Sequence, residues 1–188
     1  MIRPNIFEFK KLIKIGIPIL GSQLSYMLMG TTDTIVAGRA SSLDLAGLGV
    51  GSAIFNTVWF LIAGVIFAVT PIIAQLYGAK KFTEIGIKIR EILWIALLLG
   101  SMVCIVLFFM GNLLFLLPID ESITSISGSY LKALSVGIIF MTIFTALRCY
   151  SEGMTLTRPV FYIAFLGMLL NIPLDIVFVY GYFGVPKL

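Results

Sequence analysis

Long apolar runs separated by short charged clusters make up nearly the whole chain. Five stretches contain at most one charged residue each, at residues 15–38, 45–79, 92–119, 122–147 and 159–186. An α-helix needs about 20 mostly apolar residues to cross the hydrocarbon core of a bilayer, and each stretch is long enough. Because backbone groups in lipid find no water to bond, a helix is the structure expected of each stretch. The pattern predicts five transmembrane helices, near residues 13–38, 46–77, 86–116, 124–151 and 159–182.

Two prolines bear on where these helices begin and break. Pro71 lies inside the second stretch, so that stretch is either one long helix or two short ones, and the sequence leaves both open. Pro159 suits the first turn of the fifth helix, where its missing N–H has no helical acceptor in any case. Thr157, two residues earlier, is a candidate cap for that helix.

Composition supports a membrane location. Hydrophobic residues make up 60% of the 188-residue chain and charged residues only 12%, whereas a soluble protein carries about 25% charge. So few charges cannot cover a water-facing surface, which makes the lipid bilayer the main solvent and a partner of the chain. The net charge of +4 does not indicate a nucleic-acid partner, because Lys and Arg lie in short clusters between apolar runs rather than on one face.

Residue types that common catalytic chemistry requires are missing. The chain has no histidine, which excludes His-based triads and His-ligated zinc. Cys104 and Cys149 lie in apolar stretches without Cys-x-x-Cys spacing, and we interpret them as packing residues. No Gly-Lys dipeptide occurs, so this chain lacks a Walker A loop for ATP. We expect neither an enzyme nor a bound cofactor.

The basic residues predict an orientation in the membrane. Ten of the 13 Lys and Arg fall on the side that holds the N-terminus, and three fall on the other side. The ten are Arg3, Lys10, Lys11, Lys14, Lys80, Lys81, Lys88, Arg90, Arg148 and Arg158, and the three are Arg39, Lys132 and Lys187. Because positively charged loops stay in the cytoplasm, the N-terminus is predicted to be cytoplasmic and the C-terminus external.

Two acidic residues, Asp33 and Asp175, lie inside predicted membrane helices. An ionised side chain at the bilayer centre costs about 2.5–3.5 kcal/mol on insertion scales, so such residues usually face a cavity and mark an ion or proton path. Asp33 lies roughly 28 Å along its helix from Lys14, and Asp175 roughly 24 Å from Pro159, at 1.5 Å per residue. Both helices run in the same direction, so the two carboxylates are predicted to lie at similar height and to share one site.

Neighbouring residues add oxygen ligands to this predicted site. Asn171 precedes Asp175 by one helical turn and shares its face. Pro173 lies between them, and a proline inside a helix frees the carbonyl four residues earlier, here that of Leu169. A partly polar stripe on the first helix leads to the other acid and consists of Ser22, Tyr26, Met29 and Asp33. Carboxylate, amide and carbonyl oxygens bind hard cations, and carboxylates also accept protons.

Other interpretations of these charges stay open. Asp33 is alternatively an interfacial residue that touches water near its helix end, and both acids are alternatively incidental. Arg148 and Glu152, four residues apart, are interpreted as a local ion pair at the membrane interface. Gly47-x-x-x-Gly51 is interpreted as a site of close helix packing.

Four motifs, spread over nearly the whole chain, carry a family resemblance. They are Met29–Arg39 (MGTTDTIVAGR), Thr70–Ala79 (TPIIAQLYGA), Leu147–Gly153 (LRCYSEG) followed by Leu156–Pro159 (LTRP), and Leu170–Gly181 (LNIPLDIVFVYG). In this order they resemble the N-terminal part of the multidrug and toxic compound extrusion (MATE) family, in particular its bacterial branch. The resemblance implies an all-α membrane protein of twelve helices in two six-helix lobes that exports organic cations and drugs in exchange for Na⁺ or H⁺.

The resemblance also implies roles for individual residues. Asp33 corresponds to the first-helix acid implicated in coupling, and Asn171 and Asp175 to the cation or proton site of the N-terminal lobe. Pro18 lies where some members bend the first helix, and Pro173 is expected to bend the fifth. The coupling ion would be Na⁺ or H⁺ with no other cofactor, and the location would be the bacterial inner (plasma) membrane.

One departure from the family is large, because the predicted helices stop after the fifth. We expect either a fragment of a longer reading frame or a chain that assembles with a partner, and no transport by these 188 residues alone. Two other functions stay open. A lipid-linked oligosaccharide flippase of the same superfamily would need a strongly cationic cavity. A non-transporting membrane subunit or degenerate gene product is the other alternative, and whether the reading frame continues past Leu188 would test it. The sequence decides neither Na⁺ against H⁺ nor the drug.

Overall fold

The computed structural model describes residues 6–116, 118 and 120–180, without the side chains of residues 7, 8 and 40. Its helices are α1 (Ile6–Ala40), α2 (Ser42–Phe67), α3 (Val69–Gly78), α4 (Phe82–Leu113), the 3₁₀ turn η1 (Leu114–Leu116), α5 (Glu121–Gly153) and α6 (Thr157–Tyr180). Within these described residues, five helical segments are long and apolar enough to cross a membrane, with α2 and α3 together forming one of them. The predicted all-helical fold with five long apolar helices is confirmed.

Most helices extend beyond the ranges that the apolar runs predict. α1 begins at Ile6 rather than near residue 13, because Lys10, Lys11 and Lys14 continue the helix outside the apolar run. Lysine is a good helix former, so charge ends the apolar run without ending the helix. The predicted end of the last helix at residue 182 lies outside the described residues, as do Arg3 and Lys187 of the predicted orientation.

The second apolar run forms two helices within one crossing. α2 ends at Phe67 and α3 begins at Val69, with a turn at Ala68 between them. Pro71 explains the break, because it has no N–H to donate to the carbonyl of Phe67, four residues earlier. The whole segment from Ser42 to Gly78 remains one candidate span.

The fifth predicted helix starts earlier than expected. α6 begins at Thr157, so Thr157 is its first residue and not a cap that precedes it. The first N–H groups of a helix have no intrahelical acceptor, and Pro159 is therefore tolerated as the third residue. The expected position of Pro159 in the first turn is correct, and the expected position of Thr157 is wrong by one place.

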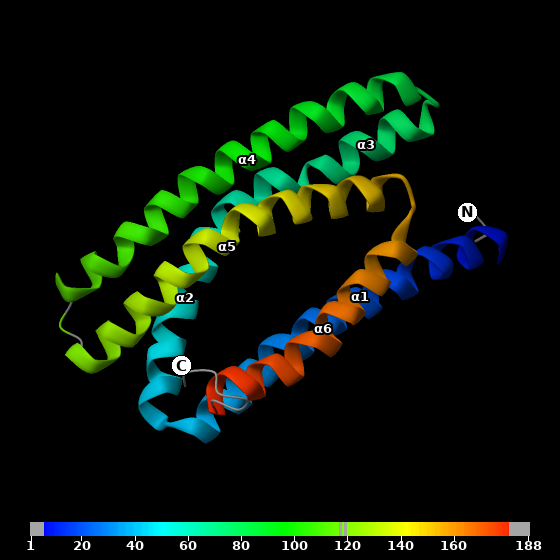
Figure 1. Cartoon of the computed structure of the whole chain (residues 1–188). Helices are drawn as coiled ribbons and strands as arrows, with labels where there is room; N and C mark the ends of the chain where they lie inside the picture. Colours follow the sequence, from blue (N-terminus) through cyan, green and yellow to red (C-terminus); the bar gives the residue numbers. More distant parts are fainter. Residues whose placement is uncertain (1–5, 117, 119, 181–188) are drawn as a thin grey trace, which may run out of the picture. The chain divides into compact units, whose positions relative to one another are not determined.

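The described chain divides into two compact units. One contains α1 up to Val36 together with α6, and the other runs from Ala37 to Met154 and contains α2 to α5. In the second unit α5 packs against α2, α3 and α4, and Figure 1 shows α4 and α5 side by side over most of their length. Two hydrophobic clusters fill this unit, one around Ile73 and Ala146 and the other around Leu107 and Leu131.

Glycines let the helices of this second unit approach closely. A Cβ added at Gly47 would lie 2.5 Å from Cγ2 of Ile126 on α5, and one at Gly51 would lie 2.6 Å from Cδ1 of Tyr130. The Ser127 hydroxyl donates a hydrogen bond of 2.8 Å to the carbonyl oxygen of Gly47. The structure therefore confirms the interpretation of the Gly47–Gly51 pair as close helix packing.

Local sequence determines several helix ends in this unit. Ser41 caps α2 by accepting hydrogen bonds from the N–H groups of Leu43 and Asp44 at 3.1 and 3.3 Å. Asp120 caps α5, because its Oδ1 accepts from the backbone N–H of Ser122 at 2.8 Å. This hydrogen bond favours the ionised carboxylate and so lowers the pKa of Asp120, which lies between two membrane-spanning segments.

The other unit consists of α1 and α6, which run side by side in the same direction (Figure 1). Near their beginnings, Lys14 and Arg158 line the same cavity. Further along, Gly21 faces the ring of Phe161, to which an added Cβ would lie at 2.6 Å. Near their ends, the side chains of Asp33 and Asp175 interact. This parallel pairing brings together acids that are far apart in the sequence.

Candidate cation site

Asn171 and Asp175 form the part of the site that α6 supplies. The side-chain amide of Asn171 donates from Nδ2 to Oδ1 of Asp175 at 3.1 Å. The two residues are one helical turn apart, so the regular helix places both side chains on the same face. Both are half-buried, and the hydrogen bond fixes the orientation of the carboxylate.

Asp33 brings a second carboxyl group to the same place from α1. Its carboxyl group lies close enough to that of Asp175 for the two charges to interact. Two carboxylates in contact repel each other when both are ionised, so a proton or a cation between them is strongly stabilising. Asp33 itself is exposed on the surface of the described unit, whereas Asp175 is half-buried. The predicted proximity of the two acids is present in the structure.

Two oxygen atoms of this cluster lack donors. Oδ1 of Asn171 and Oδ2 of Asp175 are both shielded from solvent, and neither accepts a hydrogen bond from a described residue. An unsatisfied buried polar atom costs about 1–3 kcal/mol. A bound cation, or a proton on the carboxylate, would remove part of this cost. The candidate ligand set is therefore two carboxylates and one amide oxygen.

In the polar stripe on α1, the hydroxyl of Ser22 bonds to the backbone of its own helix, as does that of Ser25 nearby. The hydroxyl of the buried Ser22 donates to the carbonyl oxygen of Pro18 at 3.0 Å, and that of Ser25 donates to the carbonyl oxygen of Gly21 at 2.9 Å. Such bonds to the preceding turn use up the hydroxyl proton. Tyr26 and Met29 are half-buried on the same helix.

The threonines around Asp33 follow the same rule, which the sequence analysis did not foresee. Their hydroxyls donate to backbone carbonyl oxygens four residues earlier at 2.8–2.9 Å, and they are Thr31, Thr32 and Thr34. None of these donated protons reaches Asp33. The run Thr-Thr-Asp-Thr in a helix could have predicted these hydrogen bonds, because Ser and Thr inside helices often bond to the preceding turn.

The two prolines of the predicted site lie inside uninterrupted helices, Pro18 in α1 and Pro173 in α6. Pro173 cannot donate to the carbonyl of Leu169, which leaves that oxygen without its helical partner one turn before the acid. The bends expected at the two prolines stay predictions.

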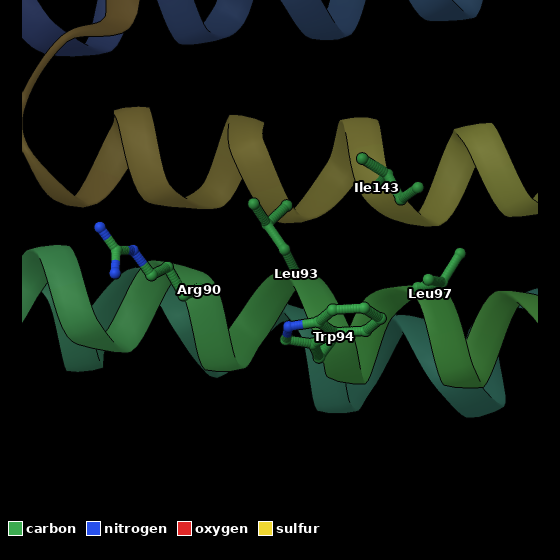
Figure 2. A pocket seen from close by; sticks show the side chains of 5 residues that line it. All are labelled: Arg90, Leu93, Trp94, Leu97 and Ile143. Atoms are coloured by element: carbon green, nitrogen blue, oxygen red, sulfur yellow. The ribbon is translucent and has the colours of Figure 1, made fainter.

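Other hollows in the structure differ chemically from this cluster. A groove of about 390 Å³ on the second unit is lined by Arg90, Leu93, Trp94 and Leu97 from α4 and by Ile143 from α5 (Figure 2). Arg90 lies at one end of the row and is its only charged residue. A groove with one basic residue and no acid offers no carboxylate ligand to Na⁺ or H⁺.

Comparison with known proteins agrees with the fold and with its membrane character. The MatE family model matches residues 18–177, a range that includes Asp33, Asn171 and Asp175. Multidrug resistance protein PmpM of Pseudomonas aeruginosa is 36% identical over 182 residues, which cover 96% of this chain and 38% of that protein. Multidrug resistance protein NorM of Vibrio cholerae is 34% identical over 181 residues, which cover 96% of this chain and 40% of that protein.

A solved structure shows the same fold. It is a MOP superfamily transporter from Pyrococcus furiosus, similar with a TM-score of 0.83 at 22% identity over 94% of this chain and 39% of that one. The chain thus spans about two fifths of the length of its curated relatives. With most of its length matched by the family model, this chain is a multi-pass membrane protein that belongs to the MatE family of transporters, which are not enzymes.

Proposed function

We propose that this chain supplies most of the N-terminal lobe of a bacterial secondary transporter that exports organic cations or drugs in exchange for Na⁺ or H⁺. The observation that carries the proposal is the interaction of Asp33 on α1 with Asp175 on α6, to which Asn171 donates a hydrogen bond. The names of its relatives, multidrug resistance proteins, support the substrate class. We place the protein in the inner membrane with a cytoplasmic N-terminus, as the distribution of Lys and Arg predicts.

Coupling would act through the repulsion between the two carboxylates. A Na⁺ or H⁺ that binds between Asp33 and Asp175 cancels this repulsion and lets α1 and α6 approach each other. Loss of the ion restores the repulsion and favours a wider separation of the two helices. Ion binding therefore shifts an equilibrium between two helix arrangements, and only a ligand with different affinities for them can do so.

Export would require more than this chain. Alternating access depends on two repeats or bundles that rock around a shared site, and this chain spans about two fifths of its relatives. The second lobe, in the same protein or in a partner chain, would complete the drug pathway. The 188 residues alone would hold the ion site and would not transport.

The test is efflux of a fluorescent organic cation from vesicles that contain the complete two-lobe transporter, under separately imposed Na⁺ and pH gradients. The gradient that drives efflux identifies the coupling ion. Asp33→Asn should abolish gradient-driven efflux and leave membrane insertion intact, because an amide cannot exchange a proton or balance a cation's charge. Asp44→Asn, on α2 near its capped start, is the matched control and should retain efflux. Full coupling in Asp33→Asn would refute the site.

A further inference from the structure

Two adjoining cavities lie between α1 and α6, near the beginnings of both helices. The first, about 650 Å³, is lined by three basic side chains, those of Lys11, Lys14 and Arg158. The second, about 540 Å³, shares Lys14 and Arg158 with the first and continues along Ile17, Phe161 and Tyr162. A cationic chamber thus opens into a mostly apolar one.

The charge at this end of the helix pair is positive. Neither Lys14 nor Arg158 forms an ion pair with another residue that the structure describes. The acids of this unit whose side chains the structure describes are Asp33 and Asp175, and they interact near the opposite ends of the two helices. Arg158 is also the second residue of α6, where the helix dipole adds partial positive charge. Lys14, Arg158 and the start of α6 would therefore stabilise a group with negative charge here.

We propose that this double cavity binds one anionic phospholipid, with its phosphate among Lys11, Lys14 and Arg158 and one acyl chain along Ile17, Phe161 and Tyr162. A guanidinium binds phosphate through two parallel hydrogen bonds, and two ammonium groups add charge without fixed geometry. Basic pockets between transmembrane helices can bind anionic headgroups. The exposed ring of Tyr162 suits the interface between headgroups and acyl chains.

The apolar chamber distinguishes a lipid from a free anion. Inorganic phosphate fills only the basic chamber and leaves the walls formed by Ile17 and Phe161 uncovered. A zwitterionic lipid fills both chambers, but its ammonium group would face three cations. Only a lipid with a net negative headgroup matches both chambers. This inference does not depend on the transport cycle.

The experiment measures lipid binding to the purified full chain in neutral detergent by native mass spectrometry. Phosphatidylglycerol and phosphatidylcholine with identical acyl chains are titrated in parallel. We expect phosphatidylglycerol to bind at least 10-fold more tightly to the wild type. The triple variant Lys11→Gln/Lys14→Gln/Arg158→Gln should lose this preference. Arg90→Gln is the matched control, because it removes one cation from the groove on α4 and should keep the preference.

A charge-conserving variant and a competition with inorganic phosphate distinguish lipid binding from misfolding and from binding of a free anion. The variant Lys11→Arg/Lys14→Arg/Arg158→Lys keeps all three charges and should keep the preference, which distinguishes loss of charge from loss of folding. Circular dichroism confirms helix content in each variant. An unchanged preference in the triple glutamine variant would overturn the proposal, and so would an equal loss in Arg90→Gln. Displacement of phosphatidylglycerol by an equal concentration of inorganic phosphate would identify a free-anion site and overturn the lipid assignment.

Discussion

The Ser127 hydroxyl donates a hydrogen bond of 2.8 Å to the carbonyl oxygen of Gly47, 80 positions earlier in the chain. This bond joins α5 to α2 at the place where Ile126 packs against the glycine. In lipid there is little hydrophobic drive between helices, so such close packing and interhelical hydrogen bonds hold them together. The absence of a side chain at residue 47 is therefore a structural requirement.

Replacing this glycine should destabilise the second unit. We expect Gly47→Ala to lower the free energy of unfolding by about 1–3 kcal/mol, the usual cost of overpacking, because the new methyl group overlaps Ile126. Gly49→Ala is the control, since no atom lies within 4 Å of its added Cβ, and it should be neutral or stabilising. Unfolding in mixed detergent micelles measures both, and equal effects would contradict this account.

Loss of the amide at residue 171 should weaken ion binding. Asn171→Ala removes the 3.1 Å hydrogen bond to Asp175, and a bond to a charged group is worth about 1.5–3 kcal/mol. We expect at least a 10-fold rise in the ion concentration that gives half-maximal efflux in the complete transporter. Asn112→Ala, exposed on α4, should leave this concentration unchanged. An unaltered ion dependence in Asn171→Ala would remove this residue from the site.

The ion pair between Arg148 and Glu152 should contribute more than a surface pair. Its side chains are 15% and 14% exposed at an Nε–Oε1 distance of 2.8 Å, whereas those of Lys88 and Glu91 are 49% and 52% exposed. Exposed pairs contribute about 0–1 kcal/mol. A double-mutant cycle should give a coupling of about 1–3 kcal/mol for the first pair and less than 1 kcal/mol for the second. Similar couplings would show that burial does not strengthen this pair.

The turn between α3 and α4 offers a stabilising substitution. Lys80 has a φ of 58° and follows the cap Ala79, while Lys81 N–H donates to the carbonyl oxygen of Leu76 and Lys80 N–H to that of Tyr77. This is a Schellman ending, in which glycine is preferred at the left-handed position. Lys80→Gly should therefore raise the free energy of unfolding by about 1 kcal/mol.

A neighbouring position supplies the control for that substitution. Ala79 has a φ of −78°, a right-handed conformation, so glycine gains nothing there. Ala79→Gly should leave stability unchanged or lower it by up to about 1 kcal/mol, because glycine loses more backbone entropy on folding. Thermal unfolding compares the two variants. A gain in Ala79→Gly as large as that in Lys80→Gly would contradict the backbone argument.

The sequence was most informative where lipid imposes simple rules. Charged residues are excluded from the hydrocarbon core, so their spacing alone predicted five crossings and the similar heights of Asp33 and Asp175. The role of these acids in ion binding stays a prediction. The sequence does not decide whether the chain breaks between α2 and α3, because Pro71 is compatible with a kink or with two helices until the packing is known.

The sequence alone could not predict features that depend on how the helices pair. From the sequence, Lys11, Lys14 and Arg158 predict only the orientation of the chain, because their convergence on one cavity depends on how α1 and α6 align. The hydroxyl bonds of the threonines beside Asp33 were also missed, since a polar residue in a helix can turn to its own backbone or away from it.

The spacing of the small residues on α2 favours the observed alignment with α5. Ile126 and Tyr130 are one turn apart and fit over Gly47 and Gly51, which are also one turn apart. Sliding by one turn, about 5.4 Å, would move Ile126 onto Gly51 and press the Tyr130 ring against Phe55. The two close contacts therefore resist sliding of α2 along α5, and we expect these two helices to move together.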